Sequence, residues 1–251
     1  MTSSFPAENR TALELPGAVP FDSHIWLQYF KQNKGLRSAI RLPEHIEINA
    51  ELRKPLLRSL QKFQIGETGE GRHLRFFAKR TNDSSYSQCI DLFVKEEQSH
   101  GQMIAEVIAA IDGRVLSWHW TDCAFILLRR AMGLKTELMI CLIAEIIGKC
   151  FYRLLADRIN NTQLSNVFAF IVCDEIAHLR FHSEFLNKHL GAYHWLLKFF
   201  VYYSWSIIFY TACFVFVLEH RDTLLKLELS PQDFVGLCSK EFQRAARCVF
   251  N

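Results

Sequence analysis

Apolar residues recur every three or four positions along most of the chain, from about residue 48 to residue 249. This spacing places them on one face of a helix, and no segment reads as a ladder of strands. Turn residues divide the pattern into predicted helices at about 48–80, 84–111, 122–159, 162–190, 193–227 and 231–249. The sequence therefore predicts an all-α fold, preceded by a loose N-terminal arm over residues 1–43.

The predicted connections are short. Residues 81–83 join the first two helices, and residues 160–161 join the third and fourth. Long helices with such short connections fold back as antiparallel neighbours, which is how four-helix bundles are built. We expect residues 44–191 to form a bundle, and residues 192–251 to add an apolar helix and an amphipathic helix packed on it.

A Glu-x-x-His step occurs twice within these helices. Glu97 and His100 form it in the second helix, and Glu175 and His178 form it in the fourth. Residues three positions apart lie on the same helix face. Each step therefore points one carboxylate and one imidazole in the same direction.

Each step also has a lone glutamate in the helix before it. Glu67 precedes Glu97 by 30 residues, and Glu145 precedes Glu175 by 30 residues. The midpoint of each pair is an asparagine in a predicted turn. Residues equally far from the turn of an antiparallel hairpin lie at the same height, here roughly 22 Å from the loop. The spacing therefore brings the lone glutamate of each hairpin next to its Glu-x-x-His step.

Such a set of four carboxylates and two imidazoles holds two iron or manganese ions in a four-helix core. Oxygen and imidazole ligands suit these ions, and the lack of cysteine in the set argues against structural zinc. A bound cation also offsets the cost of burying a carboxylate in an apolar run. The predicted metal ligands are Glu67, Glu97, His100, Glu145, Glu175 and His178.

The acid just before each Glu-x-x-His step has a predicted role as well. Metal-bound histidines usually donate their second ring N–H to a carboxylate. Asp174 is placed to accept it from His100, and Glu96 is placed to accept it from His178.

Three further residues leave alternatives open. His182 lies one turn after His178, where it is a seventh ligand, a residue that supports a ligand through a hydrogen bond, or a packing residue. Glu70 lies one turn after Glu67 and could replace it as a ligand, although its spacing to the second helix misses the turn. Glu137 lies nearer the open end of the bundle, which favours a substrate-side or surface role.

These motifs resemble the ferritin-like diiron-carboxylate superfamily. The resemblance is carried by "KEEQSH", "DEIAH" and the lone Glu67 and Glu145, and it covers roughly residues 48–190. "DEIAHLRFH" is similar to the last metal helix of the p-aminobenzoate N-oxygenase type, except that Ile171 stands where that type has an additional histidine ligand. "QIGETGEG" and "LRRAMGL" resemble small bacterial ferritin-like proteins. The resemblance implies two iron ions, or one manganese and one iron, that activate dioxygen with electrons from an external donor.

Apolar residues near the ligands in sequence favour an aromatic, amine or acyl-type substrate, and they are Phe63, Gly66, Phe93, Ile143, Ile147 and Phe168. Hydroxylation, N-oxygenation, desaturation and aldehyde chemistry all stay open. Gly66, Gly69 and Gly71 weaken the first predicted helix, and they mark either an approach to the metals or a local irregularity. Two other function classes remain: iron oxidation and storage or peroxide removal, and a metal-free helical scaffold at a membrane.

Charge and cysteine use narrow the classes of partner. The net charge of +3 comes from interspersed acidic and basic residues, without the basic run that follows a phosphate backbone, so nucleic acid is not an expected partner. The eight cysteines are scattered and form no CxxC motif, which indicates reduced thiols and a cytoplasmic protein. The first 20 residues lack the apolar segment of a signal peptide.

Residues 195–218 carry one charge, Lys198, and are long enough to cross a bilayer. Their tyrosine, tryptophan, serine and threonine content favours a helix packed on the bundle or in a homodimer interface. Attachment to the inner face of a membrane is the first alternative, and a membrane span is the second.

Overall fold

The computed structural model describes residues 20–35, 42–120 and 133–251, and all regular structure within these ranges is helical. The predicted all-α fold is confirmed. The first part of the predicted helix at 122–159 lies outside the described residues, as do residues 1–19. The helices are α2 (Ser23–Gly35), α3 (Ala50–Glu67), α4 (Arg72–Lys79), α5 (Ser84–Ala110), α7 (Leu134–Arg158), α8 (Thr162–Leu190), α9 (Trp195–Lys226) and α10 (Pro231–Phe250).

Side-chain caps determine where three of these helices begin. The side chain of Asp83 accepts a hydrogen bond from the backbone N–H of Tyr86 at the start of α5. Asn161 does the same at the start of α8, and Ser230 does so at the start of α10. Each cap satisfies a backbone N–H that has no partner within the helix. The predicted helix starts at 84, 162 and 231 agree with these caps.

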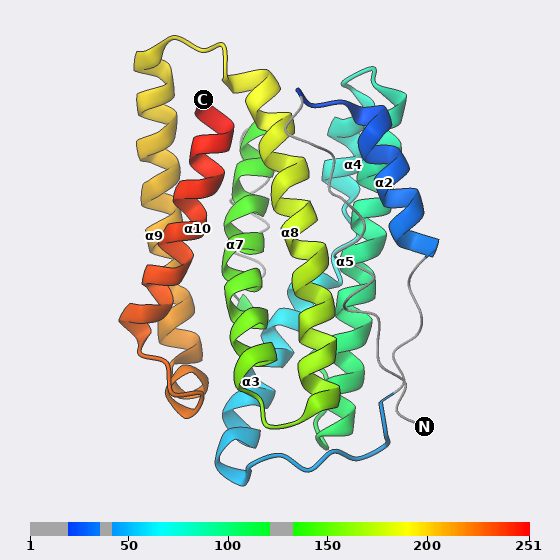
Figure 1. Cartoon of the computed structure of the whole chain (residues 1–251), viewed down its shortest axis with the longest axis vertical. Coiled ribbons are helices and arrows are strands. Elements are labelled where there is room, and N and C mark those ends of the chain that lie inside the picture. Colours follow the sequence, from blue (N-terminus) through cyan, green and yellow to red (C-terminus); the bar gives the residue numbers. More distant parts are fainter. Residues whose placement is uncertain (1–19, 36–41, 121–132) are drawn as a thin grey trace.

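Two helical hairpins lie side by side in the molecule (Figure 1). The first hairpin comprises α3, α4 and α5, and the second comprises α7 and α8. Asn82, in the turn of the first hairpin, has a φ of 58°, a left-handed conformation that asparagine adopts more readily than most residues. α5 also packs on α8, so the two hairpins bury their apolar faces against each other.

The predicted helix at 48–80 was wrong in one respect, because it is interrupted between α3 and α4. Gly71 has a φ of 59°, and a Cβ atom there would lie 2.5 Å from Cγ2 of Val94. The chain therefore needs glycine at this position, both for its conformation and for its close approach to α5. The interruption directly follows Glu67, the last residue of α3.

Residues 23–35 correct the expectation of a loose N-terminal arm, because they form α2, which packs on α5. Trp26 and Phe30 lie one turn apart and are buried against Phe181 of α8. The indole Nε1 of Trp26 also donates to Glu184 Oε2 at 2.8 Å. These contacts fix α2 across α5 and α8, one helix from each hairpin.

The two C-terminal helices pack on the side of the molecule away from α2 (Figure 1). α9 contacts α3 and α10, and α10 contacts α7 and α8. Trp205 donates from Nε1 to the Met139 carbonyl at 2.8 Å, and His220 shares a hydrogen bond with Ser59, which binds the inner face of α9 to the bundle. By length and composition alone, α9 is the one helix among the described residues that could cross a membrane.

Candidate metal centre

Acidic and histidine side chains from α3, α5, α7 and α8 converge between the two hairpins. They form two groups, and within each group the potential ligand atoms all lie within 4.8 Å of one another. One group is Glu67, Glu97 and His100, and the other is Glu97, Glu145, Glu175 and His178. All six predicted ligands therefore meet, and Glu97 belongs to both groups.

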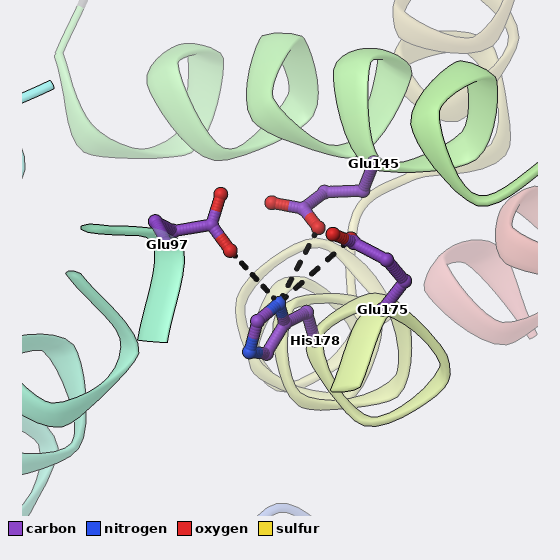
Figure 2. A group of neighbouring side chains, drawn as sticks. All are labelled: Glu97, Glu145, Glu175 and His178. Carbon is purple, nitrogen blue, oxygen red and sulfur yellow. Dashed lines mark ion pairs between the residues drawn. The ribbon is translucent and has the colours of Figure 1, made fainter. Parts of the chain in front are cut away.

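His178 lies at the centre of the larger group (Figure 2). Its Nδ1 atom is 3.1 Å from Glu97 Oε1, 3.5 Å from Glu145 Oε2 and 3.8 Å from Glu175 Oε2. These carboxylates come from α5, α7 and α8. The ring nitrogen and the three carboxylates thus face a common point.

His100 occupies the equivalent position in the smaller group. Its Nδ1 atom is 3.6 Å from Glu97 Oε1 and 3.4 Å from Glu175 Oε1. Glu97 and Glu175 therefore each face both histidines. Glu67 lies on the His100 side, and Glu145 lies on the His178 side. This arrangement offers two neighbouring ion positions with two carboxylates between them.

The acids before the Glu-x-x-His steps hold both histidines from outside. His100 Nε2 is 3.0 Å from Asp174 Oδ2, and His178 Nε2 is 2.9 Å from Glu96 Oε2. Each histidine is thus paired with the acid of the opposite hairpin, as the sequence predicted. Because a carboxylate accepts a hydrogen bond from Nε2–H, Nδ1 is the nitrogen of each ring that faces the inside of the cluster.

Asn33 of α2 joins these two outer carboxylates, and sequence reasoning missed it. Its Nδ2 atom donates to Glu96 Oε1 at 2.9 Å and to Asp174 Oδ1 at 3.0 Å. The side chain is buried, and Phe30, three residues earlier, lies against the ring of His178. The sequence did contain a sign of this role, because Asn33 is a polar residue on the same helix face as the apolar Trp26 and Phe30.

Tyr152 and Gly101 also shape the centre without having been predicted. The buried Tyr152 hydroxyl donates to Glu67 Oε1 at 2.6 Å, and Tyr152 lies two turns after Glu145 on the same face of α7. A Cβ atom at Gly101 would lie 3.0 Å from Cγ2 of Thr68 and 3.4 Å from Cβ of Glu67. Glycine at 101 therefore lets α5 approach the end of α3 closely enough to bring Glu67 into the cluster.

Burial raises the pKa of three of the four ligand carboxylates. For Glu67 the pKa lies well above its ordinary value because of burial and the neighbouring Glu97. For Glu175 it lies well above because of burial and the neighbouring Glu145, and the pKa of Glu97 is raised by the same two causes. Without a cation, burial and mutual repulsion oppose the ionisation of these three carboxylates.

The carboxylates around His178 act on its pKa in the opposite direction from burial. Burial alone would lower the pKa of His178, but the carboxylates that face its ring, Glu145 and Glu175 first among them, raise it well above the ordinary value. Burial alone would raise the pKa of Glu145, but the close approach of Glu175 and His178 lowers it to about 2. The carboxylates of the cluster therefore favour a positive charge at its centre.

The inward-facing atoms of this cluster are not satisfied by the described parts of the protein. Five of them form no hydrogen bond of good geometry there, namely Glu97 Oε1, His100 Nδ1, Glu145 Oε2, Glu175 Oε2 and His178 Nδ1. Buried polar atoms are rarely left without a partner. Their number, chemistry and common direction fit metal ions.

Solvent reaches the two sides of the centre unequally. Both histidines are fully buried, beneath Asn33 and Phe30. On the other side the Glu97 side chain is 19% exposed, and the residues at the interruption between α3 and α4 are exposed. The helix interruption is thus the more open side of the cluster.

The three open alternatives lie outside the two ligand groups. Glu70 is exposed and pairs with Arg72, so its proposed replacement of Glu67 was wrong because the chain turns away after α3. Glu137 is buried, 3.0 Å from His73 Nδ1, which excludes a surface role. His182 is buried beside Phe93, its pKa is lowered to about 4 by burial, and neither ring nitrogen bonds to a described residue.

Most of the apolar residues expected around the ligands are buried. Phe93 packs edge-on against both His178 and His182, with ring centroids 4.8 and 4.6 Å apart. Phe168 stacks on Tyr152, and Ile143 and Ile147 are buried as well. Phe63 is half-buried on Phe151 and Tyr152, but Gly66 is exposed, contrary to its expected place among the apolar residues around the ligands.

Comparisons of this chain with protein-family models, with curated proteins and with solved structures found no match. The donor set and its surroundings therefore carry the functional inference.

Proposed function

We propose that this protein binds two iron ions, or one manganese and one iron, and acts as a dioxygen-dependent oxidase or oxygenase on an apolar organic substrate. The proposal rests on one observation above all: the two groups of donor atoms share Glu97. A shared carboxylate is what two ions a few ångströms apart require. A single-ion site would need neither the second histidine nor the fourth glutamate.

The donor set favours iron or manganese over other metals. Four carboxylates and two imidazoles are hard and intermediate ligands, and no thiolate belongs to either group. Two divalent cations also balance the charge of four ionised carboxylates. This is the ligand pattern of di-iron and di-manganese carboxylate bundles, which agrees with the resemblance in the sequence.

When bound and reduced, a dinuclear iron centre supplies the electrons that activate dioxygen. The residues of the chain have supporting tasks. Glu97 and Glu175, which face both histidines, would bind both ions, while Glu67 and Glu145 would each bind one. Asp174 and Glu96 orient the two histidines. The Tyr152 hydroxyl donates a hydrogen bond to Glu67 Oε1, with the two oxygens 2.6 Å apart, on the more open side.

The surroundings favour an apolar substrate. Phe93, Ile143, Ile147 and Phe168 keep water away from the buried side of the ligands. An oxidising centre needs such a shell because water would otherwise consume the reactive species. The interruption between α3 and α4 is the side from which a substrate and dioxygen would approach.

Metal analysis and oxygen uptake together test this proposal. We expect about two metal ions per chain after desalting, and oxygen uptake when the reduced, iron-loaded protein meets air. Lipophilic amines, aldehydes and acyl thioesters should then be screened for consumption under turnover with a chemical reductant. Absence of tightly bound metal would contradict the proposal and favour a metal-free scaffold.

Two measurements distinguish the proposed oxygenase from a protein that oxidises and stores iron without an organic substrate. A storage protein would take up far more than two iron ions per chain and would form a very large particle. The proposed oxygenase should stop at about two ions and remain a small assembly. Oxygen uptake without consumption of any substrate in the screen would remove the support for the oxygenase half of the proposal.

A further inference from the structure

The outer face of α9 carries a row of exposed apolar side chains, which we term the α9 row. Its members recur every three or four residues, as in the seam of two packed helices. Ile207, in the middle, is the most exposed of them at 68%. The α9 row consists of Leu196, Phe200, Tyr203, Ile207, Tyr210, Phe214 and Leu218.

The α9 row reads the same in both chain directions. A tyrosine lies three or four residues from Ile207 on either side, a phenylalanine lies seven residues away on either side, and a leucine lies eleven residues away on either side. In a two-fold interface the same patch on each subunit meets itself. An antiparallel pair of α9 helices centred on Ile207 would therefore set each side chain against one of its own kind.

We propose that two copies of this chain associate through antiparallel packing of their α9 rows, with Ile207 at the two-fold axis. Tyr203 of one copy then lies opposite Tyr210 of the other, and Phe200 lies opposite Phe214. This interface is separate from the metal centre, and it does not depend on the proposed chemistry.

The size of the exposed face suits a stable dimer. Its side chains are roughly half to two-thirds exposed. With about 150–250 Å² for each large aromatic, the α9 row presents on the order of 800 Å² per copy, which is one partner's share of a standard interface. A shallow hollow bordered by Tyr203, Ile207, Tyr210 and Phe214 gives this face relief into which side chains can pack.

The position of α9 leaves the row available. α9 forms an outer edge of the molecule (Figure 1), and its opposite face is fixed by the hydrogen bond from Trp205 to the Met139 carbonyl.

The charge pattern favours a second protein copy over a lipid surface. Helices that lie on anionic bilayers are rich in lysine and arginine along their polar face. α9 has no lysine or arginine between residues 199 and 218. Lys198, just before this stretch, donates to the Phe250 carbonyl at 2.7 Å.

The first test is the mass of the protein in solution, measured by size-exclusion chromatography with light scattering in detergent-free buffer. We expect the mass of two chains for the natural protein and of one chain for Ile207→Glu, because that substitution would place two carboxylates face to face at the axis. Phe76→Glu, at an exposed apolar residue of α4, is the matched control and should remain a dimer. Circular dichroism and bound metal should be unchanged in both variants.

The second test concerns the direction of pairing. Tyr203→Arg and Tyr210→Glu should each weaken the dimer, and the double variant should restore it, because antiparallel packing sets the introduced charges opposite each other. In a Cys248→Ser background, Ile207→Cys should form an intermolecular disulfide under mild oxidation. The equally exposed Leu218→Cys should not, since its counterpart across the axis is Leu196.

Three outcomes would overturn the proposal. One is a monomeric natural protein at micromolar concentration. Another is a dimer that Ile207→Glu leaves intact. The third is a monomer that floats with vesicles of phosphatidylcholine and phosphatidylglycerol and loses that binding in Ile207→Glu, which would assign the α9 row to a membrane surface.

Discussion

The two hairpins have the same ligand spacing but different backbones. In both, a lone glutamate lies 30 residues before the glutamate of a Glu-x-x-His step. In the second hairpin, α7 continues for three turns beyond Glu145. In the first hairpin, α3 ends at Glu67 and the chain turns through Gly71 before α4 begins. The spacing sets the height at which the ligands meet, while the continuity of the helix decides whether solvent reaches them.

Because of this difference, the two proposed ion positions have different surroundings. Glu145 is buried within a continuous helix, whereas Glu67 lies beside exposed residues at a helix end. Both groups nonetheless contain Glu97, Glu175 faces both histidines, and Asn33 donates to both outer carboxylates. We therefore expect substitutions at shared residues to affect both ions, and substitutions at the two lone glutamates to differ from each other.

Removing a shared ligand should have the largest effect. In Glu97→Ala, or in Glu175→Ala, both ions lose a bridging carboxylate, and we expect bound metal to fall from about two ions per chain to near zero. In Glu145→Ala we expect about one ion to remain, because water cannot easily replace a ligand in the buried hairpin. Glu67→Ala should retain more than Glu145→Ala, since water can enter at the interruption. Elemental analysis after desalting measures each value.

Circular dichroism serves as the control for folding in this series. Retention of a full ion by Glu97→Ala would contradict the shared position of that residue. Equal losses in Glu67→Ala and Glu145→Ala would remove the difference between the hairpins.

Substitution of Asn33 should have the next largest effect on metal binding, and it should weaken both ions equally. Asn33→Leu removes the donor to both outer carboxylates while preserving most of the side-chain volume. Loss of such outer partners typically lowers metal affinity about 10- to 100-fold. Chelator competition with cobalt measures this change, and Gln32→Leu, at an exposed residue of the same helix, is the control. Weakening of one ion alone would show that Asn33 supports a single hairpin.

The sequence was sufficient to predict that the six candidate ligands lie close together, because their placement depends on local rules. Helix period, capping residues and equal distances from a turn predicted that Glu67 would meet Glu97 and that Glu145 would meet Glu175. The same rules predicted the outer pairs of Asp174 with His100 and Glu96 with His178, because an acid next to a ligand points toward the neighbouring helix.

The remaining features depend on contacts between segments far apart in the chain. Asn33 precedes Glu96 by 63 residues and Asp174 by 141 residues. No local sequence pattern indicates a contact between residues so far apart in the chain. Three glycines signalled a weak helix near Glu67, but a cost of about 1 kcal/mol per glycine does not decide between a bent helix and an interrupted one. The contact of Gly71 with Val94 decides it, and that contact exists only in the folded protein.

The glycines of the first hairpin provide the third test. Gly71→Ala should destabilise the protein by about 1–2 kcal/mol from its left-handed conformation alone, with a further cost from contact with Val94. Gly66→Ala should stabilise it by up to about 1 kcal/mol, because Gly66 is helical and its Cβ would meet open space. Urea unfolding of the metal-free protein measures both. Stabilisation by both substitutions would mean that Gly71 does not maintain the interruption.

Tyr152→Phe should have the smallest effect and should distinguish the two ions. It removes the hydrogen bond to Glu67 and leaves the ring stacked on Phe168. A hydrogen bond to a charged group contributes about 1.5–3 kcal/mol, but water at the interruption can replace part of it. We therefore expect at most about a tenfold loss of affinity, confined to the ion that Glu67 binds.

The control for Tyr152→Phe is Tyr86→Phe. Tyr86 is an equally buried tyrosine whose hydroxyl forms no hydrogen bond with the described residues, so its removal should leave both affinities unchanged. Stepwise cobalt titration resolves the two binding events. If Tyr152→Phe weakened the binding of both ions equally, Glu67 would have to influence both positions. The interruption between α3 and α4 would then not define a separate ion site.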